Sequence, residues 1–118
     1  MSAGRSTFHL APAELWSDAE PAAALPAPSL QADGFIHCTT GADEMVATAN
    51  RHYRADPRDF VVLTIDLDRV TSPVRTDDPG GIYPHIFGPI DRAAILAARP
   101  MPRAADGTFL AFDDASEG

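Results

Sequence analysis

The sequence predicts a single, loop-rich α+β domain. Residues 60–65 form an almost unbroken run of β-branched and aliphatic side chains, which is typical of a central strand covered on both faces. Residues 42–53 carry apolar side chains at helical spacing, while 11 prolines and 8 glycines indicate many turns. At 118 residues the chain supports one hydrophobic core, so we expect one domain over residues 7–112, between a flexible N-terminus, 1–6, and an acidic tail, 113–118.

The first expected elements are a short strand and a short helix. Residues 7–11 alternate between apolar and polar side chains, so we expect Phe8 and Leu10 on one buried face and His9 pointing away from them. Pro12 suits the first turn of the helix that follows, because its missing N–H would be unpaired there in any case.

A loop, a strand and a longer helix are predicted next. The prolines of residues 21–34 indicate an extended surface loop, and residues 34–39 then predict a strand. Thr40 and Asp43 have the spacing of a capping box, so we expect the longer helix to begin beside Thr40 and to end near Arg54.

The second half of the chain predicts mostly extended structure around the central strand. In residues 83–90 a proline favours extended geometry and a Gly-Pro pair ends the segment. Residues 93–98 suit a helix by propensity or a strand by their apolar run, and periodicity does not decide between the two. Residues 107–112 predict a last, short strand.

Charge and cysteine content argue against several classes of protein. The formal net charge is −8 and the nine arginines are scattered, so we expect no nucleic-acid partner. The single cysteine cannot form an intrachain disulfide, and the N-terminus lacks the apolar run of a secretion signal. No segment is long and apolar enough to span a bilayer, so we expect a cytoplasmic protein with no membrane partner and leave its oligomeric state open.

Three histidines occupy similar local settings. His9, His37 and His85 each adjoin apolar strand residues near a turn or a helix start. Because imidazole can donate, accept or change charge near neutral pH, we expect these side chains to line a shared cleft for a small-molecule ligand. The alternative is that each one only satisfies a backbone group or fills a polar corner of the core. His52 differs, because it lies late in the predicted helix.

Metal and thiol chemistry are not expected. No pair of histidines or cysteines has zinc-ligand spacing, although His9, His37 and His85 could still converge on a metal ion. Cys38 could act as a nucleophile with a histidine base, but neighbouring strand residues point to opposite faces, so His37 and Cys38 should not meet. A small buried filler is the favoured interpretation of Cys38.

Two threonines precede the longer helix. Thr40 is expected to cap it, whereas Thr39 is a candidate ligand contact. Asp43 and Glu44 already occupy the first turn and would repel an anion at the helix N-terminus. The carboxylates in and after the central strand are interpreted as a solvated edge: Asp66, Asp68, Asp77 and Asp78.

Several motifs along the chain carry a family resemblance. They are "FHLAPAELW", "PSLQADGFIHCTT", "ANRHYR", "DFVVLTIDLDRV", "YPHIFGPI" and "DGTFLAF". In this order, over residues 7–112, they resemble the bacterial domain-of-unknown-function family numbered 952. That family resembles the ADP-ribosyltransferase fold, whose members bind NAD between two small split β-sheets. The resemblance therefore implies split sheets with two short helices in a single compact domain.

The resemblance also implies roles for particular residues. His9 matches the position that bonds the nicotinamide-side ribose, and His85 falls near the place where many of these enzymes have a catalytic glutamate. These two histidines are the catalytic candidates, although an imidazole does not supply the negative charge that stabilises a developing positive charge on the ribose. NAD is the implied cofactor, contacted by His9, His37, Thr39, Thr40 and Tyr83.

The resulting expectation is a protein that binds NAD or a nucleotide-like metabolite in a histidine-lined cleft and could transfer ADP-ribose to a small molecule or a protein. The alternative is a non-catalytic module that binds a small metabolite, and a structural domain with satisfied core histidines is a third interpretation. RNA 2′-phosphotransferase activity is not expected, because the sequence lacks clustered basic residues that could grip phosphates.

Overall fold

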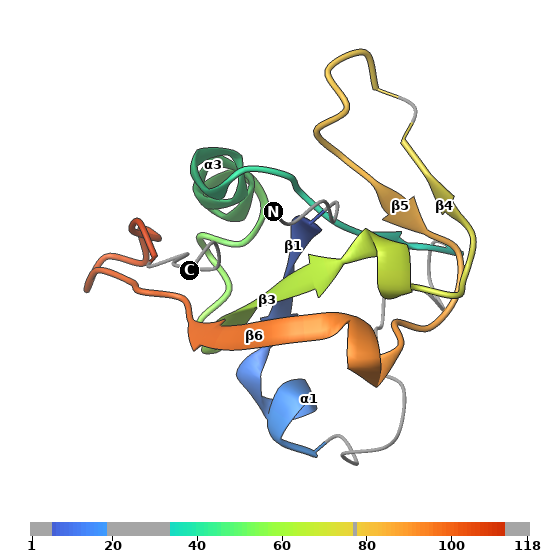
Figure 1. Ribbon diagram of the computed structural model, residues 1–118. Helices are drawn as coiled ribbons and strands as arrows, with labels where there is room; N and C mark the ends of the chain where they lie inside the picture. Colours follow the sequence, from blue (N-terminus) through green and yellow to red (C-terminus); the bar gives the residue numbers. More distant parts are fainter. Residues whose placement is uncertain (1–5, 19–33, 77, 113–118) are drawn as a thin grey trace.

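The computed structural model describes residues 6–18, 34–76 and 78–112, which form one small α+β domain, as predicted (Figure 1). The strands form two three-stranded antiparallel sheets. The first sheet holds β1 (Ser6–Pro12), β3 (Phe60–Asp66) and β6 (Ile95–Pro100), and the second holds β2 (Ile36–His37), β5 (His85–Ile86) and β4 (Val74–Arg75). The described helices are α1 (Ala13–Asp18) and α3 (Ala42–His52), with 3₁₀ turns η1 (Leu67–Arg69) and η2 (Arg92–Ala94).

Strand β3 lies at the centre of the first sheet, between β1 and β6, which confirms the prediction from its apolar run. Its residues alternate between two covered faces: Leu63 and Ile65 point to one apolar cluster, and Phe60 and Val62 point to another. Because each face packs against another layer, the strand is apolar nearly throughout instead of alternating with polar residues.

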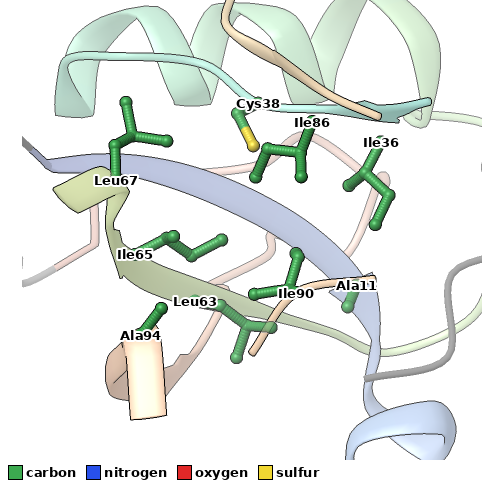
Figure 2. Close-up of a cluster of buried hydrophobic side chains, with 9 residues drawn as sticks. All are labelled: Ala11, Ile36, Cys38, Leu63, Ile65, Leu67, Ile86, Ile90 and Ala94. Carbon is green, nitrogen blue, oxygen red and sulfur yellow. The ribbon is translucent and has the colours of Figure 1, made fainter. Parts of the chain in front are cut away.

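The first apolar cluster fills the space between the two sheets. Figure 2 shows Ile36, Cys38 and Ile86, from the second sheet and the chain after β2, on the opposite side of the cluster from Leu63 and Ile65 of β3. Each of these five residues is exposed by 2% or less. Burying one large aliphatic side chain contributes about 1.5–3 kcal/mol, so this cluster holds the two sheets together.

The second apolar cluster covers the other face of the first sheet. Met45 and Ala49 of α3 are buried there with Phe60 of β3, which confirms the predicted apolar face of the helix. The Asn50 amide then fixes the C-terminal segment, since its Nδ2 donates to the Phe109 carbonyl over 3.1 Å and its Oδ1 accepts from the Phe109 N–H over 2.7 Å. Helix α3 and the C-terminal segment therefore form one layer.

Backbone pairing brings the two sheets side by side. In the second sheet His37 of β2 lies opposite His85 of β5. The chain just after β2 then meets the first sheet, because Phe8 and Thr39 exchange two backbone hydrogen bonds of 2.9 and 2.8 Å. As a result β1, β2 and β5 lie next to one another.

Two predictions about helix starts are wrong. Pro12 closes β1 and does not open a helix, and α1 begins at the next residue. The predicted capping box at Thr40 is also absent: α3 begins after Gly41, whose φ of 99° favours glycine, and no side chain caps it. The Thr40 hydroxyl is instead 2.9 Å from the Thr7 hydroxyl, so tertiary contact outcompetes local capping.

Strand β1 is covered on both faces and not on one. Thr7 and Ala11 are as buried as Phe8 and Leu10, because the second sheet packs on one side of the strand and α3 on the other. The predicted loop after α1 lies almost wholly outside the described residues, as do the N-terminal five residues and the acidic tail.

In the C-terminal third of the chain, the structure decides between helix and strand for one segment and shows that the strand predicted for another is wrong. Residues 93–98 belong to η2 and then to β6, so the strand alternative holds, because β3 offers an edge with which β6 pairs. Residues 107–112 contain no strand, only an isolated bridge at Phe109, because the side chain of Asn50 takes the place of a partner strand. Strand β4 was not predicted.

Candidate functional site

All four histidines of the chain line one cavity of about 440 Å³, although they come from four separate elements. His9 lies on β1, His37 on β2, His52 at the end of α3 and His85 on β5. We call this space the histidine cavity. The structure thus brings together the three histidines predicted to share a cleft and adds the fourth, which the sequence set apart.

The rings of His37 and His85 form one wall of the histidine cavity. Their centroids are 5.6 Å apart with an interplanar angle of 74°, because the two residues are directly paired across β2 and β5. Phe35 stacks on His85 with centroids 4.3 Å apart and an angle of 25°, and it lies 4.7 Å from the ring of His37. The aromatic contacts restrict the orientation of both imidazoles.

His9 is held in one tautomer. Its Nδ1 lies 2.8 Å from the backbone carbonyl of His37, which can only accept, so Nδ1 carries the proton. Burial lowers the pKa of His9 below its ordinary value of 6.5, although the bond to this carbonyl acts in the opposite direction. Neutral His9 therefore leaves Nε2 unprotonated, as a hydrogen-bond acceptor and a weak base.

The two candidate threonines separate in the structure. Thr39 is 3% exposed and lines the histidine cavity, whereas Thr40 does not line it and bonds to Thr7. Cys38 also borders the cavity, but it is 2% exposed, which confirms that it is a buried filler. Burial raises the pKa of its thiol to about 12, so the thiolate nucleophile is not available near neutral pH.

Tyr83 reaches the histidine cavity from a loop that Asp78 orders. The Asp78 carboxylate accepts hydrogen bonds from the backbone N–H groups of Ile82, over 2.8 Å, and Tyr83, over 2.9 Å. The first of these bonds is the main reason why the pKa of Asp78 is lowered. This carboxylate, interpreted from sequence as part of a solvated edge, thus positions a cavity residue; its neighbour Asp77 lies outside the described residues.

Helix α3 contributes cavity residues that sequence reasoning missed. Thr48, Arg51 and His52 all line the histidine cavity, together with Met45. Met45, Thr48 and His52 are spaced by three and four residues, so they share one helix face, and this spacing is the signal that could have found them. The Thr48 hydroxyl is buried without a hydrogen-bond partner among the described residues, which is unusual because nearly all buried polar groups in proteins are hydrogen-bonded.

The described lining of the histidine cavity contains no carboxylate, although the chain carries a net charge of −8. Arg51 is exposed there and forms no hydrogen bond or ion pair within the described part of the chain. The cavity is therefore suited to an anionic ligand. Among residues 6–18, 34–76 and 78–112, no group of three side chains could hold a metal ion, and no helix could cross a membrane.

The fold and the cavity define a small α+β protein with a histidine-lined cavity whose described lining contains no carboxylate. Residues 10–98 match the family described as "Protein of unknown function (DUF952)", and the chain belongs to that family. Two crystal structures of protein CC0527 from Caulobacter crescentus, one of a double mutant, share the fold: each has a TM-score of 0.74 at 19% identity and covers 90% of this chain and 94% of that one. None of the curated proteins matches the chain.

Proposed function

We propose that the protein binds a nucleotide-like metabolite in the histidine cavity, with NAD as the first candidate. The observation that carries this proposal is the convergence of four imidazoles, from four elements, on one cavity of about 440 Å³. Cavities that bind small molecules measure about 300–1,000 Å³ and combine an apolar lining with a few polar groups. The histidine cavity has both properties.

Each chemical part of a nucleotide has a complementary group in the lining. The rings of Tyr83 and His85 offer flat faces for a base or a nicotinamide ring. The unprotonated Nε2 of His9 can accept a hydrogen bond from a ribose hydroxyl, and the Thr39 hydroxyl can donate or accept another. Arg51 supplies the positive charge that a phosphate requires.

The resemblance to the ADP-ribosyltransferase fold is the reason for placing NAD first. In that fold NAD lies between two small sheets. Here the histidine cavity is lined by β1 of the first sheet and by β2 and β5 of the second, in addition to α3. A kinship of folds is a weaker argument for a ligand than the chemistry of the lining, so the experiment must compare several nucleotides.

The residues that line the histidine cavity favour binding of the ligand without cleavage of a bond. Cleavage of the nicotinamide glycosidic bond develops positive charge on the ribose, which a carboxylate stabilises, and no described lining residue is a carboxylate. Transfer of ADP-ribose is the second candidate. The neutral imidazole of His9 favours it, because its Nε2 could take the proton of an acceptor hydroxyl, with His85 as the second acid–base group.

Calorimetric titration with NAD, ADP-ribose and AMP tests the proposal. We expect saturable binding at one site, and a loss of affinity of about tenfold or more in His85→Phe, which keeps a ring stacked on Phe35 but lacks the nitrogens. Arg69→Gln, at an exposed position of η1, is the matched control and should bind as the wild type does. The proposal is wrong if none of the three nucleotides binds. Release of nicotinamide from NAD, together with ADP-ribose bonded to an acceptor and not to water, would establish the transferase alternative.

A further inference from the structure

A second hollow lies beside the histidine cavity at the C-terminal end of α3. It measures about 430 Å³ and is lined by Asn50, Arg51, His52, Arg54, Ala55 and Asp106. Two of these residues, Arg51 and His52, line the histidine cavity as well. They are the last two residues of α3, so the end of this helix is a wall that the two spaces share.

The shared wall carries the unbalanced positive charge of the region. In the second hollow, Arg54 is 3.4 Å from the carboxylate of Asp106, so these two charges largely offset each other. Arg51 has no such partner among the described residues, and the exposed imidazole of His52 beside it can donate a hydrogen bond. An anionic group is therefore best placed at the wall, between the two hollows.

A helix C-terminus ordinarily disfavours an anion, because its unpaired carbonyls carry partial negative charge. Here Arg103 offsets that effect. Its guanidinium donates to the backbone carbonyls of Tyr53, over 3.2 Å, and Arg54, over 3.0 Å, just past the end of α3, and also to that of Asp56. The carbonyls at this helix end therefore have a cationic donor of their own, and Arg51, which has no partner among the described residues, can bind an anion.

We propose that the two hollows form one bipartite site for a dinucleotide, that is, two ring-bearing nucleosides joined by a diphosphate. The diphosphate lies against Arg51 and His52, one nucleoside occupies the histidine cavity, and the other occupies the second hollow. The inference rests on the proposed function and narrows it from nucleotides in general to dinucleotides. The hydroxyl of Thr48, one turn before His52, has no hydrogen-bond partner within the described part of the chain and is an additional donor beside the diphosphate.

Titration of the full chain with NAD, nicotinamide mononucleotide and AMP tests this arrangement. A charge-assisted hydrogen bond and a second occupied hollow should make NAD bind about 10- to 100-fold more tightly than either mononucleotide. Arg51→Gln should remove most of that advantage and flatten the salt dependence of NAD binding, whereas Arg69→Gln on η1 should change neither.

Ala55→Trp provides a separate test, because Ala55 is exposed and lines only the second hollow. The new side chain fills that hollow, so the affinity for NAD should fall to that for nicotinamide mononucleotide, while the affinity for the mononucleotide stays the same. Circular dichroism and thermal unfolding confirm that the variant is folded.

The outcomes separate the two proposals. If NAD and the mononucleotides bind with equal affinity and Ala55→Trp changes nothing, the bipartite site is wrong while nucleotide binding in the histidine cavity stands. If none of the nucleotides binds, the proposed function fails and the bipartite site fails with it.

Discussion

The two residue pairs that join β2 and β5 meet opposite environments. Ile36 and Ile86 are fully buried between the two sheets, whereas the adjacent pair, His37 and His85, borders the histidine cavity. Successive strand residues point to opposite faces, so one register places both pairs. A shift of one residue would bury the imidazoles and expose the isoleucines, so the apolar core selects the register that forms the site.

Truncation on the apolar side of this strand pair should have the largest effect. Ile86→Ala leaves a cavity at the centre of the second sheet, where the residue is 0% exposed, so we expect the free energy of unfolding to fall by about 2–5 kcal/mol. Urea denaturation measures the change.

The polar side should behave differently. His85→Phe keeps the ring and its stacking on Phe35, so the free energy of unfolding should change by less than about 1 kcal/mol even though ligand affinity falls. Equal losses of stability in Ile86→Ala and His85→Phe would contradict the division between a core face and a site face.

The arginines also divide into one that lines the cavity and one that stabilises the fold. Arg51 lines the histidine cavity without a partner among the described residues, whereas Arg103 donates to several backbone carbonyls: those of Gly107, Arg58, Tyr53, Arg54 and Asp56. Its guanidinium also lies 4.3 Å from the ring centroid of Phe109. Arg103 therefore joins the end of α3 to the C-terminal segment.

Removing the guanidinium of Arg103 should have the second largest effect on stability. Arg103→Gln leaves carbonyls without their charged donor, and we expect a loss of about 2 kcal/mol in the free energy of unfolding. Arg103→Lys should not restore it, because one ammonium cannot reproduce the planar fork. Arg51→Gln is the matched control, with a change within about 0.5 kcal/mol. If the control loses as much stability as Arg103→Gln, the proposed separation of structural and binding arginines is wrong.

His9 both stabilises the fold and lines the histidine cavity. Its Nδ1 bonds to the His37 carbonyl, and its ring faces the cavity. Burial holds its folded pKa below the unfolded value, so the unfolded chain gains the proton first as the pH falls. The stabilising effect of neutral His9 is present above its unfolded pKa of about 6.5 and is lost as the pH falls through that value toward the folded pKa.

The difference between the folded and the unfolded pKa of His9 gives the smallest of the expected effects on stability. The stability of the wild type should decline relative to that of His9→Gln between pH 7.5 and pH 5, with a slope no steeper than about 1.4 kcal/mol per pH unit for the one proton. Urea denaturation across this pH range measures the difference. A difference that stays constant from pH 7.5 to pH 5 would show that the pKa of His9 is the same in the folded and unfolded chains.

Local sequence patterns predicted the elements whose apolar side chains pack against the core in a regular pattern. The apolar run of β3 and the helical stripe of α3 report burial directly, and both were identified correctly. The segment around Phe109 was not, because its backbone pairs with the side chain of Asn50, 59 residues earlier in the chain. A periodicity cannot reveal a partner of that kind. Thr40 was misassigned for the same reason, since its hydroxyl contacts Thr7.

The candidate site was predictable to a similar extent. His9, His37 and His85 stood out because each lies beside apolar strand residues, and they line one cavity together with Thr39 and Tyr83. The contribution of α3 was overlooked, since helical cationic residues are most often solvated. Which side of α3 faces the second sheet depends on how the helix packs on the first.

By itself the sequence determined a single α+β domain, its central strand, its amphipathic helix and three histidines in strand settings, because these follow from composition and from the short-range alternation of apolar side chains. Only the tertiary structure decided that four imidazoles and Arg51 surround one space and that the end of α3 divides it from a second hollow. The reason is physical: a cavity is formed by surfaces from distant segments, and it exists only after those segments have packed around a common core.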